Sequence, residues 1–142
     1  MQFVKIPKDR IAVLIGTHGD VKTQVEERTG VEIQVDSKTG DVNLAEENAK
    51  DPAAVLKVRD FVLAVGRGFS PDRALGLLND DYCFYVLDIR EYVGKDPKHI
   101  RRIKARLIGS HGKTRRIIEE LSEAELSIYG HTVGIIGELE AA

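Results

Sequence analysis

Apolar and polar residues in the first half of the chain recur with the periods of strands and helices. Pro7 ends a short opening strand, because proline cannot donate to a strand ladder, and Gly30 ends a helix as its C-terminal cap. The last helix of this half places valines at helical spacing along one face. The predicted elements are a strand (3–6), two helices (9–15 and 19–29), two strands (31–35 and 41–45) and a helix (52–65).

The second half follows the same order after a short helix that begins at Ser70-Pro71. An apolar run opens it as a strand, and residues 91–100 form an insertion before its first helix. The predicted elements are a short helix (72–78), a strand (82–89), two helices (100–108 and 112–121) and the two strands of a hairpin (125–129 and 132–136).

The two halves are copies of one another. Residues 11–35 match residues 104–128 without a gap, with nine identities, and apolar positions match apolar positions. The identities include two pairs of adjacent carboxylates, Glu26-Glu27 and Glu119-Glu120. Adjacent residues do not share a helix face, so we predict that these carboxylates are solvent-exposed and form no catalytic pair.

The second copy stops without a counterpart of the last helix of the first copy. Four apolar sheet positions are then left without cover: Leu126, Ile128, Val133 and Ile135. We expect a helix beyond residue 142, another chain or the first copy to cover them. The helix-forming composition of residues 138–142 favours the first of these.

The predicted fold is therefore α+β, with two small domains that each pack a three-stranded antiparallel sheet on helices. We place the first domain at 1–68, a short helical bridge at 69–81 and the second domain, incomplete at its C-terminal end, at 82–142.

Each copy joins its two helices by a four-residue turn with a glycine at both ends. These turns are Gly16-Thr17-His18-Gly19 and Gly109-Ser110-His111-Gly112. Glycines let the backbone turn tightly, and backbone N–H groups at a helix N-terminus suit a phosphate. His18 and His111 could donate to a phosphate, stack on a base or serve only as small polar turn residues, and the sequence leaves these roles open.

The segments Ile6-Pro7 and Leu14-Ile15-Gly16-Thr17-His18-Gly19 resemble the signature of a type I KH domain. The order β-α-α-β-β-α agrees with that resemblance. It implies a module that binds single-stranded nucleic acid and clamps about four nucleotides with its GXXG loop.

Residues 66–74 and 107–116 resemble segments of the two-KH assembly factor of the small ribosomal subunit, the partner of the Nob endonuclease in eukaryotes. The resemblance covers essentially the whole chain, and the lack of a long N-terminal extension resembles archaeal members. It implies binding near the 3′ end of small-subunit rRNA during late maturation. It also implies two protein partners, the endonuclease and the alpha subunit of translation initiation factor two.

Charge is distributed unevenly along the chain. Residues 90–116 carry ten lysines and arginines against two acidic residues, a local charge of +8, whereas the remaining residues sum to −10. Such a segment favours a polyanion as partner, although a solvated helix face is the alternative. Asp20 follows the first loop, whereas Lys113 follows the second, so we predict that the second loop is the main RNA site.

The candidate RNA-binding residues lie in the two loops and the helices that flank them. In the second copy they are Gly109, Ser110, His111, Gly112, Lys113, Arg115, Arg116, Arg101, Arg102, Lys104 and Arg106. In the first copy they are Gly16, Thr17, His18, Gly19 and Lys22. The first copy is predicted to be a weaker RNA site or a protein-docking module.

Neither metal nor cofactor is expected. His99 and His131 do not have metal-ligand spacing with the loop histidines. The sequence Gly112-Lys113-Thr114 lacks the earlier glycine of a phosphate-binding P-loop, because that position is Leu107. We therefore predict a non-catalytic protein.

The single cysteine, Cys83, is compatible with a reducing cytoplasm, and no apolar run approaches the roughly 18 residues of a membrane span. We predict a cytoplasmic RNA-binding factor. The alternatives are an RNA-binding KH subunit of an RNA-processing or exosome-type complex, and a protein-docking scaffold.

Overall fold

The computed structural model describes residues 2–138, and its element order confirms the internal repeat. The first half contains β1 (Gln2–Lys5), α1 (Ile11–Ile15), α2 (Asp20–Thr29), β2 (Glu32–Val35), β3 (Asp41–Ala45) and α3 (Ala54–Gly66). The next part contains α4 (Pro71–Ala74), β4 (Tyr82–Asp88), α5 (Arg90–Val93), α6 (Pro97–Ile108), α7 (Lys113–Ser122), β5 (Glu125–Tyr129) and β6 (Thr132–Glu138). Single 3₁₀ turns occupy Lys8–Arg10, Thr17–Gly19, Leu75–Leu78 and Ser110–Gly112.

Both halves build the predicted three-stranded antiparallel sheet, with the last strand in the centre. The strand orders are β1-β3-β2 and β4-β6-β5. The registers also correspond, because Val4 lies opposite Val42 in the first sheet and Leu87 lies opposite Val133 in the second. The α+β fold with two KH-type units is confirmed.

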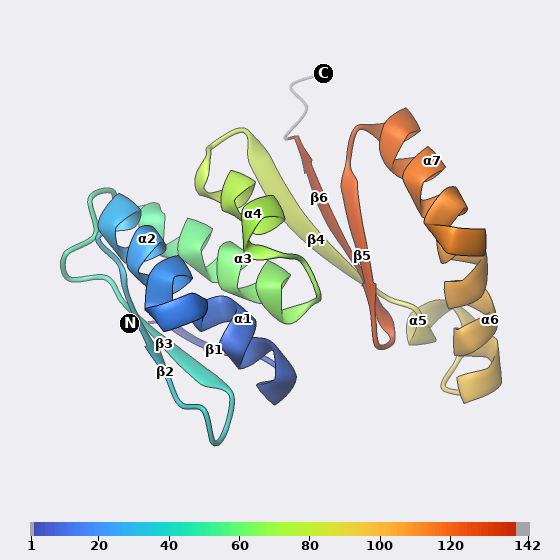
Figure 1. Cartoon of the computed structure of the whole chain (residues 1–142), viewed down its shortest axis with the longest axis horizontal. Coiled ribbons are helices and arrows are strands. Elements are labelled where there is room, and N and C mark those ends of the chain that lie inside the picture. Colours follow the sequence, from blue (N-terminus) through green and yellow to red (C-terminus); the bar gives the residue numbers. More distant parts are fainter. Residues whose placement is uncertain (1, 139–142) are drawn as a thin grey trace.

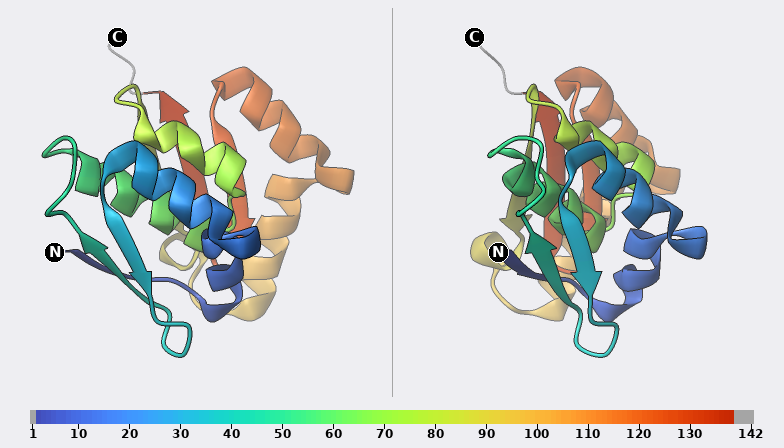
Figure 2. Two further views of the ribbon diagram at one scale, coloured as in Figure 1. Left: turned by 60° about the vertical axis from the view of Figure 1, so that its left-hand side comes forward. Right: turned by 90° about the vertical axis from the view of Figure 1, so that its left-hand side faces the viewer.

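The molecule is layered as sheet, helices, sheet, helices (Figure 1). Helices α3 and α4 lie between the two sheets, and the two further views show the same stacking (Figure 2). The first sheet is therefore covered on one face only. The second sheet is covered on both faces, by the first half on one side and by α6 and α7 on the other.

One large hydrophobic core extends beyond the first half. It contains Phe61 and Val62 of α3, but also Phe69 and Leu77 from the segment predicted as a bridge and Ile136 from β6. The ring of Phe69 meets that of Phe84 edge to face, with centroids 6.2 Å apart. The bridge is thus packed between the two sheets, while its boundaries at 68 and 81 stay a prediction.

The second core is small. Among residues 2–138, Ile89, Leu126 and Val133 are the only ones buried in it, with half-buried side chains from α5, α6 and α7 packed around them. Leu126 and Val133 are therefore covered, contrary to the expectation of a bare sheet face. An exposed apolar side chain of this sheet lies on β4 instead. Leu87 is 42% exposed, whereas its counterpart Val4 is 7% exposed beneath α3.

The first half does not substitute for a last helix of the second. It packs on the opposite face of the second sheet, where the hydroxyl of Ser127 donates to the carbonyl of Arg67 at 2.9 Å and Phe69 lies over Gly134. The expected helix-forming segment 139–142 lies outside the described residues.

The prediction that both pairs of adjacent carboxylates are mere surface was wrong for the first member of each pair. A carboxylate oxygen of Glu26 accepts from the backbone N–H of Ile33 at 2.8 Å. Glu119 accepts from the N–H of Leu126 at the same distance. Each glutamate thus ties the second helix of its half to the strand that follows. Glu27 and Glu120 are exposed as predicted.

Three helix starts differ from prediction, and one of them is α1, which begins at Ile11 rather than at residue 9, after the 3₁₀ turn Lys8–Arg10. Helix α6 begins at Pro97 rather than near Ile100, because Asp96 caps it by accepting from the N–H of Lys98 at 2.9 Å. Helix α3 begins at Ala54, two residues after Pro52, although Asp51 accepts from the N–H of Ala53 at 2.8 Å.

Candidate nucleic-acid interface

The two GXXG loops share one backbone geometry. Gly16 and Gly109 open them at φ +81° and +72° with ψ near 180°, a region that is essentially restricted to glycine. Gly19 and Gly112 close them, both at φ +75°. The sequence repeat therefore encodes the same turn twice, each at the N-terminus of a helix.

The first glycine of each loop is also required for space. A Cβ at Gly109 would lie 2.2 Å from the hydroxyl of Thr114, and one at Gly16 would lie 2.1 Å from a carboxylate oxygen of Asp20. A Cβ at Gly112 would meet nothing closer than 3.8 Å, and one at Gly19 nothing within 4 Å. The loops thus keep an open outer side at their closing glycines.

Both loop histidines adopt a left-handed backbone. His18 and His111 have φ +54°, which is uncommon for a residue with a side chain. Both side chains are exposed. They project from the turn beside the N-terminus of the next helix, where the helix dipole favours an anion.

The two loops differ electrostatically at their exits. Asp20 begins α2, and its carboxylate accepts from the N–H of Val21 at 2.8 Å. It places a negative charge at the helix N-terminus that a phosphate would approach. Lys113 holds the equivalent position in α7 and is exposed, so the second loop presents a positive charge there.

Most of the predicted basic residues of the second half are free for a ligand. Six of these seven residues form no ion pair within residues 2–138, and Arg115 is the exception. Five of the six are exposed, and Lys104 is half-buried. These residues are Arg101, Arg102, Lys104, Arg106, Lys113 and Arg116. They lie along α6 and α7, on both sides of the second loop.

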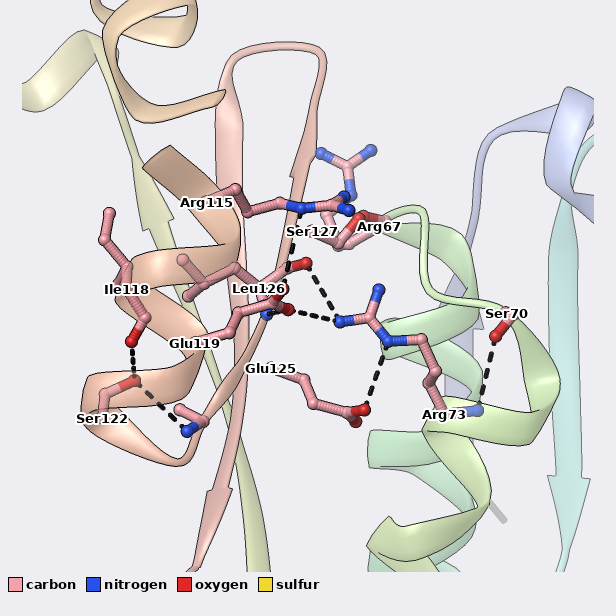
Figure 3. A network of polar contacts seen from close by, with 11 residues as sticks. Arg67, Ser70, Arg73, Arg115, Ile118, Glu119, Ser122, Glu125, Leu126 and Ser127 are labelled. Carbon is pink, nitrogen blue, oxygen red and sulfur yellow. Dashed lines mark hydrogen bonds and ion pairs between the residues drawn. The ribbon is translucent and has the colours of Figure 1, made fainter. Parts of the chain in front are cut away.

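Two predicted residues have partners within the chain. Arg115 points toward Glu119, with its Nε 3.7 Å from a carboxylate oxygen, and Figure 3 shows Arg73 approaching the same carboxylate from α4 in the bridge segment. In the first half, Lys22 lies 3.9 Å from Glu26. The structure therefore places Arg115 toward the contact between the halves.

One cavity adjoins the basic helix and was not foreseen from the sequence. It measures about 310 Å³ and lies between α5 and α6, and it is lined by Val93, His99, Arg102, Ile103 and Arg106. The spacing of His99, Arg102 and Arg106 along one face of a helix could have indicated it.

A polar contact fixes the second hairpin to the first half. The hydroxyl of Tyr129 hydrogen bonds to Asp9, and this bond raises the pKa of Tyr129. The guanidinium carbons of Arg10 and Arg67 lie 5.9 and 5.3 Å from the centre of its ring. The two halves are thus held in a defined orientation.

Over residues 2–138, no three His, Cys, Asp or Glu side chains gather where they could hold a metal ion. None of the helices in that range is both long and apolar enough to traverse a bilayer.

Comparison with known families identifies both halves. Residues 1–55 match the KH domain, and residues 83–142 match the eukaryotic-type KH domain, type I, of the second Pno1 unit. A KH domain-containing protein of Methanocaldococcus jannaschii is 47% identical over 140 residues, 99% of this chain and 61% of that protein. The pre-rRNA-processing protein pno1 of Schizosaccharomyces pombe is 30% identical over 139 residues, 96% of this chain and 58% of that protein.

Two solved structures of one archaeal protein are also similar. Dim2p from Pyrococcus horikoshii superposes with a TM-score of 0.86 at 47% identity, over 97% of this chain and 81% of that one. The same protein in a complex with a/eIF2alpha and rRNA gives a TM-score of 0.90, over 97% of this chain and 76% of that one. The chain spans about 60% of the length of the curated relatives that it matches.

Proposed function

Because this chain belongs to the Pno1/Dim2p family of KH-domain proteins, we propose that it binds single-stranded small-subunit rRNA near its 3′ end during late maturation of the subunit. The observation that carries this proposal is the second GXXG loop. It joins the geometry of an anion-binding helix N-terminus to a cluster of free cations on the two helices that it connects.

In this role the second half supplies most of the affinity. Ser110 and His111 lie at the tip of the loop, and Lys113 and Arg116 begin the helix behind it. The first half has the same turn but carries Asp20 at its exit. It is a weaker RNA site or a surface for a protein.

The role is non-catalytic. The side chains around the loop are cationic, hydroxyl-bearing or apolar, and they suit binding of a phosphodiester backbone rather than its cleavage. We also propose a cytoplasmic location, with which the single cysteine, Cys83, is compatible.

Two protein partners accompany this proposal. The Nob-type endonuclease would act on the rRNA while this protein holds it. The alpha subunit of translation initiation factor two is the second, and the name of the Pyrococcus complex, which pairs Dim2p with a/eIF2alpha and rRNA, supports it.

The test compares equal changes in the two loops. Replacing Ser110 and His111 by aspartate sets two like charges against phosphate, and affinity for a 3′-terminal rRNA oligonucleotide should fall more than tenfold, about 1.4 kcal/mol. The matched variant Thr17→Asp/His18→Asp should lose less. Fluorescence anisotropy measures both.

An equal or larger loss from the first loop would reverse the ranking of the sites. No loss from either loop would overturn the proposed RNA site. Circular dichroism of both variants verifies the fold, which exposed loop positions leave intact.

A further inference from the structure

We propose that the cavity between α5 and α6 is a second RNA subsite, which takes one nucleotide next to those held by the second GXXG loop. This inference rests on the proposed function and extends it to residues outside the loop. The ligand is a nucleotide with its base, rather than a bare phosphate.

The lining of the cavity has both kinds of group that such a ligand requires. Val93 and Ile103 supply an apolar wall, and His99, Arg102 and Arg106 supply nitrogen donors. Arginine can stack on a base through its planar guanidinium and also pair with a phosphate. A volume of about 310 Å³ lies at the lower end of ligand-sized cavities, which suits one nucleotide.

The charges in the cavity lack a counter-charge within the described residues. No carboxylate between residues 2 and 138 pairs with His99, Arg102 or Arg106, whereas Arg73, Arg90 and Arg115 all have such partners. Arg102 and Arg106 are four residues apart on α6, a spacing at which like charges destabilise a helix. A bound anion would remove that repulsion.

The position of the cavity fits a continuing strand. Arg106 precedes Gly109 by three residues, and His99 precedes it by ten, so the basic face extends about 15 Å along α6 from the loop. An RNA strand held at the loop can therefore run along α6 and reach the cavity.

Within the described residues, the first half has no counterpart of α5, which forms one wall of this cavity. Residues 91–100 are an insertion, whereas in the first copy only Pro7 and the 3₁₀ turn Lys8–Arg10 separate β1 from α1. The insertion therefore adds α5 and the first turns of α6 to the second copy alone. It gives that copy a longer RNA footprint than the first.

The test couples changes in the protein to changes in the RNA. The probe is a 12-nucleotide oligomer from the 3′ end of an archaeal small-subunit rRNA, shortened one nucleotide at a time from each end. Affinities are measured for the full chain, for Arg102→Gln/Arg106→Gln and for the control Lys98→Gln/Arg101→Gln. The control removes the same charge from exposed positions of α6 that do not line the cavity.

We expect one terminal truncation to cost the full chain about tenfold and the cavity variant less than twofold, because the nucleotide removed is the one that the cavity holds. The control should weaken every oligomer by a similar factor. An abasic residue at the coupled position should lose most of the tenfold, since it keeps the phosphate and removes the base.

If the cavity variant lost affinity by the same factor for every oligomer, the cavity would contribute only non-specific electrostatic attraction. That result would overturn the subsite. An abasic residue without effect would reduce it to a phosphate contact and overturn the assignment of a base. A decaglutamate peptide that displaces RNA from the full chain but not from the cavity variant would assign the cavity to an acidic protein segment instead.

The loop variant Ser110→Asp/His111→Asp separates the two proposals. If it binds the 12-mer as tightly as the full chain, the loop is not the RNA site, while the coupling at the cavity is still measured. If the full chain binds no oligomer, both proposals fail.

Discussion

The guanidinium of Arg73 lies 2.6 Å from the carboxylate of Glu119, and this contact joins the bridge segment to the helix that carries the second loop. The same carboxylate oxygen accepts from the N–H of Leu126. Glu119 therefore fixes α7 both to the strand that follows it and to the bridge segment (Figure 3).

Replacing Glu119 by alanine should lower the free energy of unfolding by about 2 kcal/mol, because it leaves the amide of Leu126 without its acceptor and removes one of the two carboxylates that pair with Arg73, the other being Glu125. The neighbouring change Glu120→Ala should stay within about 0.5 kcal/mol, since that side chain is exposed. Urea unfolding measures both. Similar losses for the two variants would contradict the role given to Glu119.

RNA binding should depend strongly on salt. If four of the free cations on α6 and α7 neutralise phosphates of a single strand, the slope of log K against log salt concentration should be about −3. Filter binding between 50 and 300 mM KCl gives this slope. A slope near zero would favour the protein-docking scaffold over an RNA-binding factor.

The opening and closing glycines of the second loop should differ in their tolerance of a side chain. Gly109→Ala should cost more than about 2 kcal/mol in stability, because it combines a glycine-only backbone with a clash against Thr114. Gly112→Ala should cost about 1 kcal/mol, the strain of the left-handed conformation alone. Denaturant unfolding of both variants is the measurement, and equal costs would mean that the loop relaxes around Gly109.

The hydrogen bond between Tyr129 and Asp9 should make stability depend on alkaline pH. The hydrogen bond raises the pKa of Tyr129 in the folded state. The stabilisation is therefore complete below the ordinary tyrosine pKa of about 10 and is lost as the pH rises through the pKa of the folded state. Tyr129→Phe keeps the ring between Arg10 and Arg67 but removes the hydroxyl. The stability difference between wild type and this variant should therefore shrink from pH 9 to pH 11, and a constant difference would refute the linkage.

Equivalent apolar positions of the two sheets should differ in what they contribute. Val4→Ala should destabilise by about 2 kcal/mol, because Val4 is buried beneath α3. Leu87→Ala removes more carbon but should cost about 1 kcal/mol or less, because nothing in the described chain covers that side chain fully. A larger cost at Leu87 would show that its exposure does not reflect its packing in solution.

Much of the fold was predictable because the sequence contains two copies of one pattern. A strand that ends at Pro7 and a helix that ends at Gly30 are local signals, and the second copy repeats the pattern that they frame. The start of α6 was missed although Asp96-Pro97 is a strong N-terminal signal, because residues 91–100 have no counterpart in the first copy and were assigned to an insertion. Here local capping prevailed over the analogy between copies.

The candidate site was predictable in its loops and less so in its side chains. The glycines and the charge of residues 90–116 locate the loop and its basic surroundings. The pair Arg115 and Glu119 has the i, i+4 spacing of neighbours on one helix face, which the sequence displays. Nothing local indicates that Arg73 approaches the same carboxylate, since that contact depends on where the bridge segment packs. The same holds for Glu26 and Glu119, whose partners are amides seven residues later on a different element.

Phe69 belongs to neither copy of the repeat, yet it seals the core of the first half and lies over the centre of the second sheet. A side chain shared in this way couples the unfolding of the two halves, because exposing it opens both cores together. The two units are therefore not independent folding units. We expect them to melt as one cooperative body, and a fragment cut at the repeat boundary would carry an open core into any binding assay.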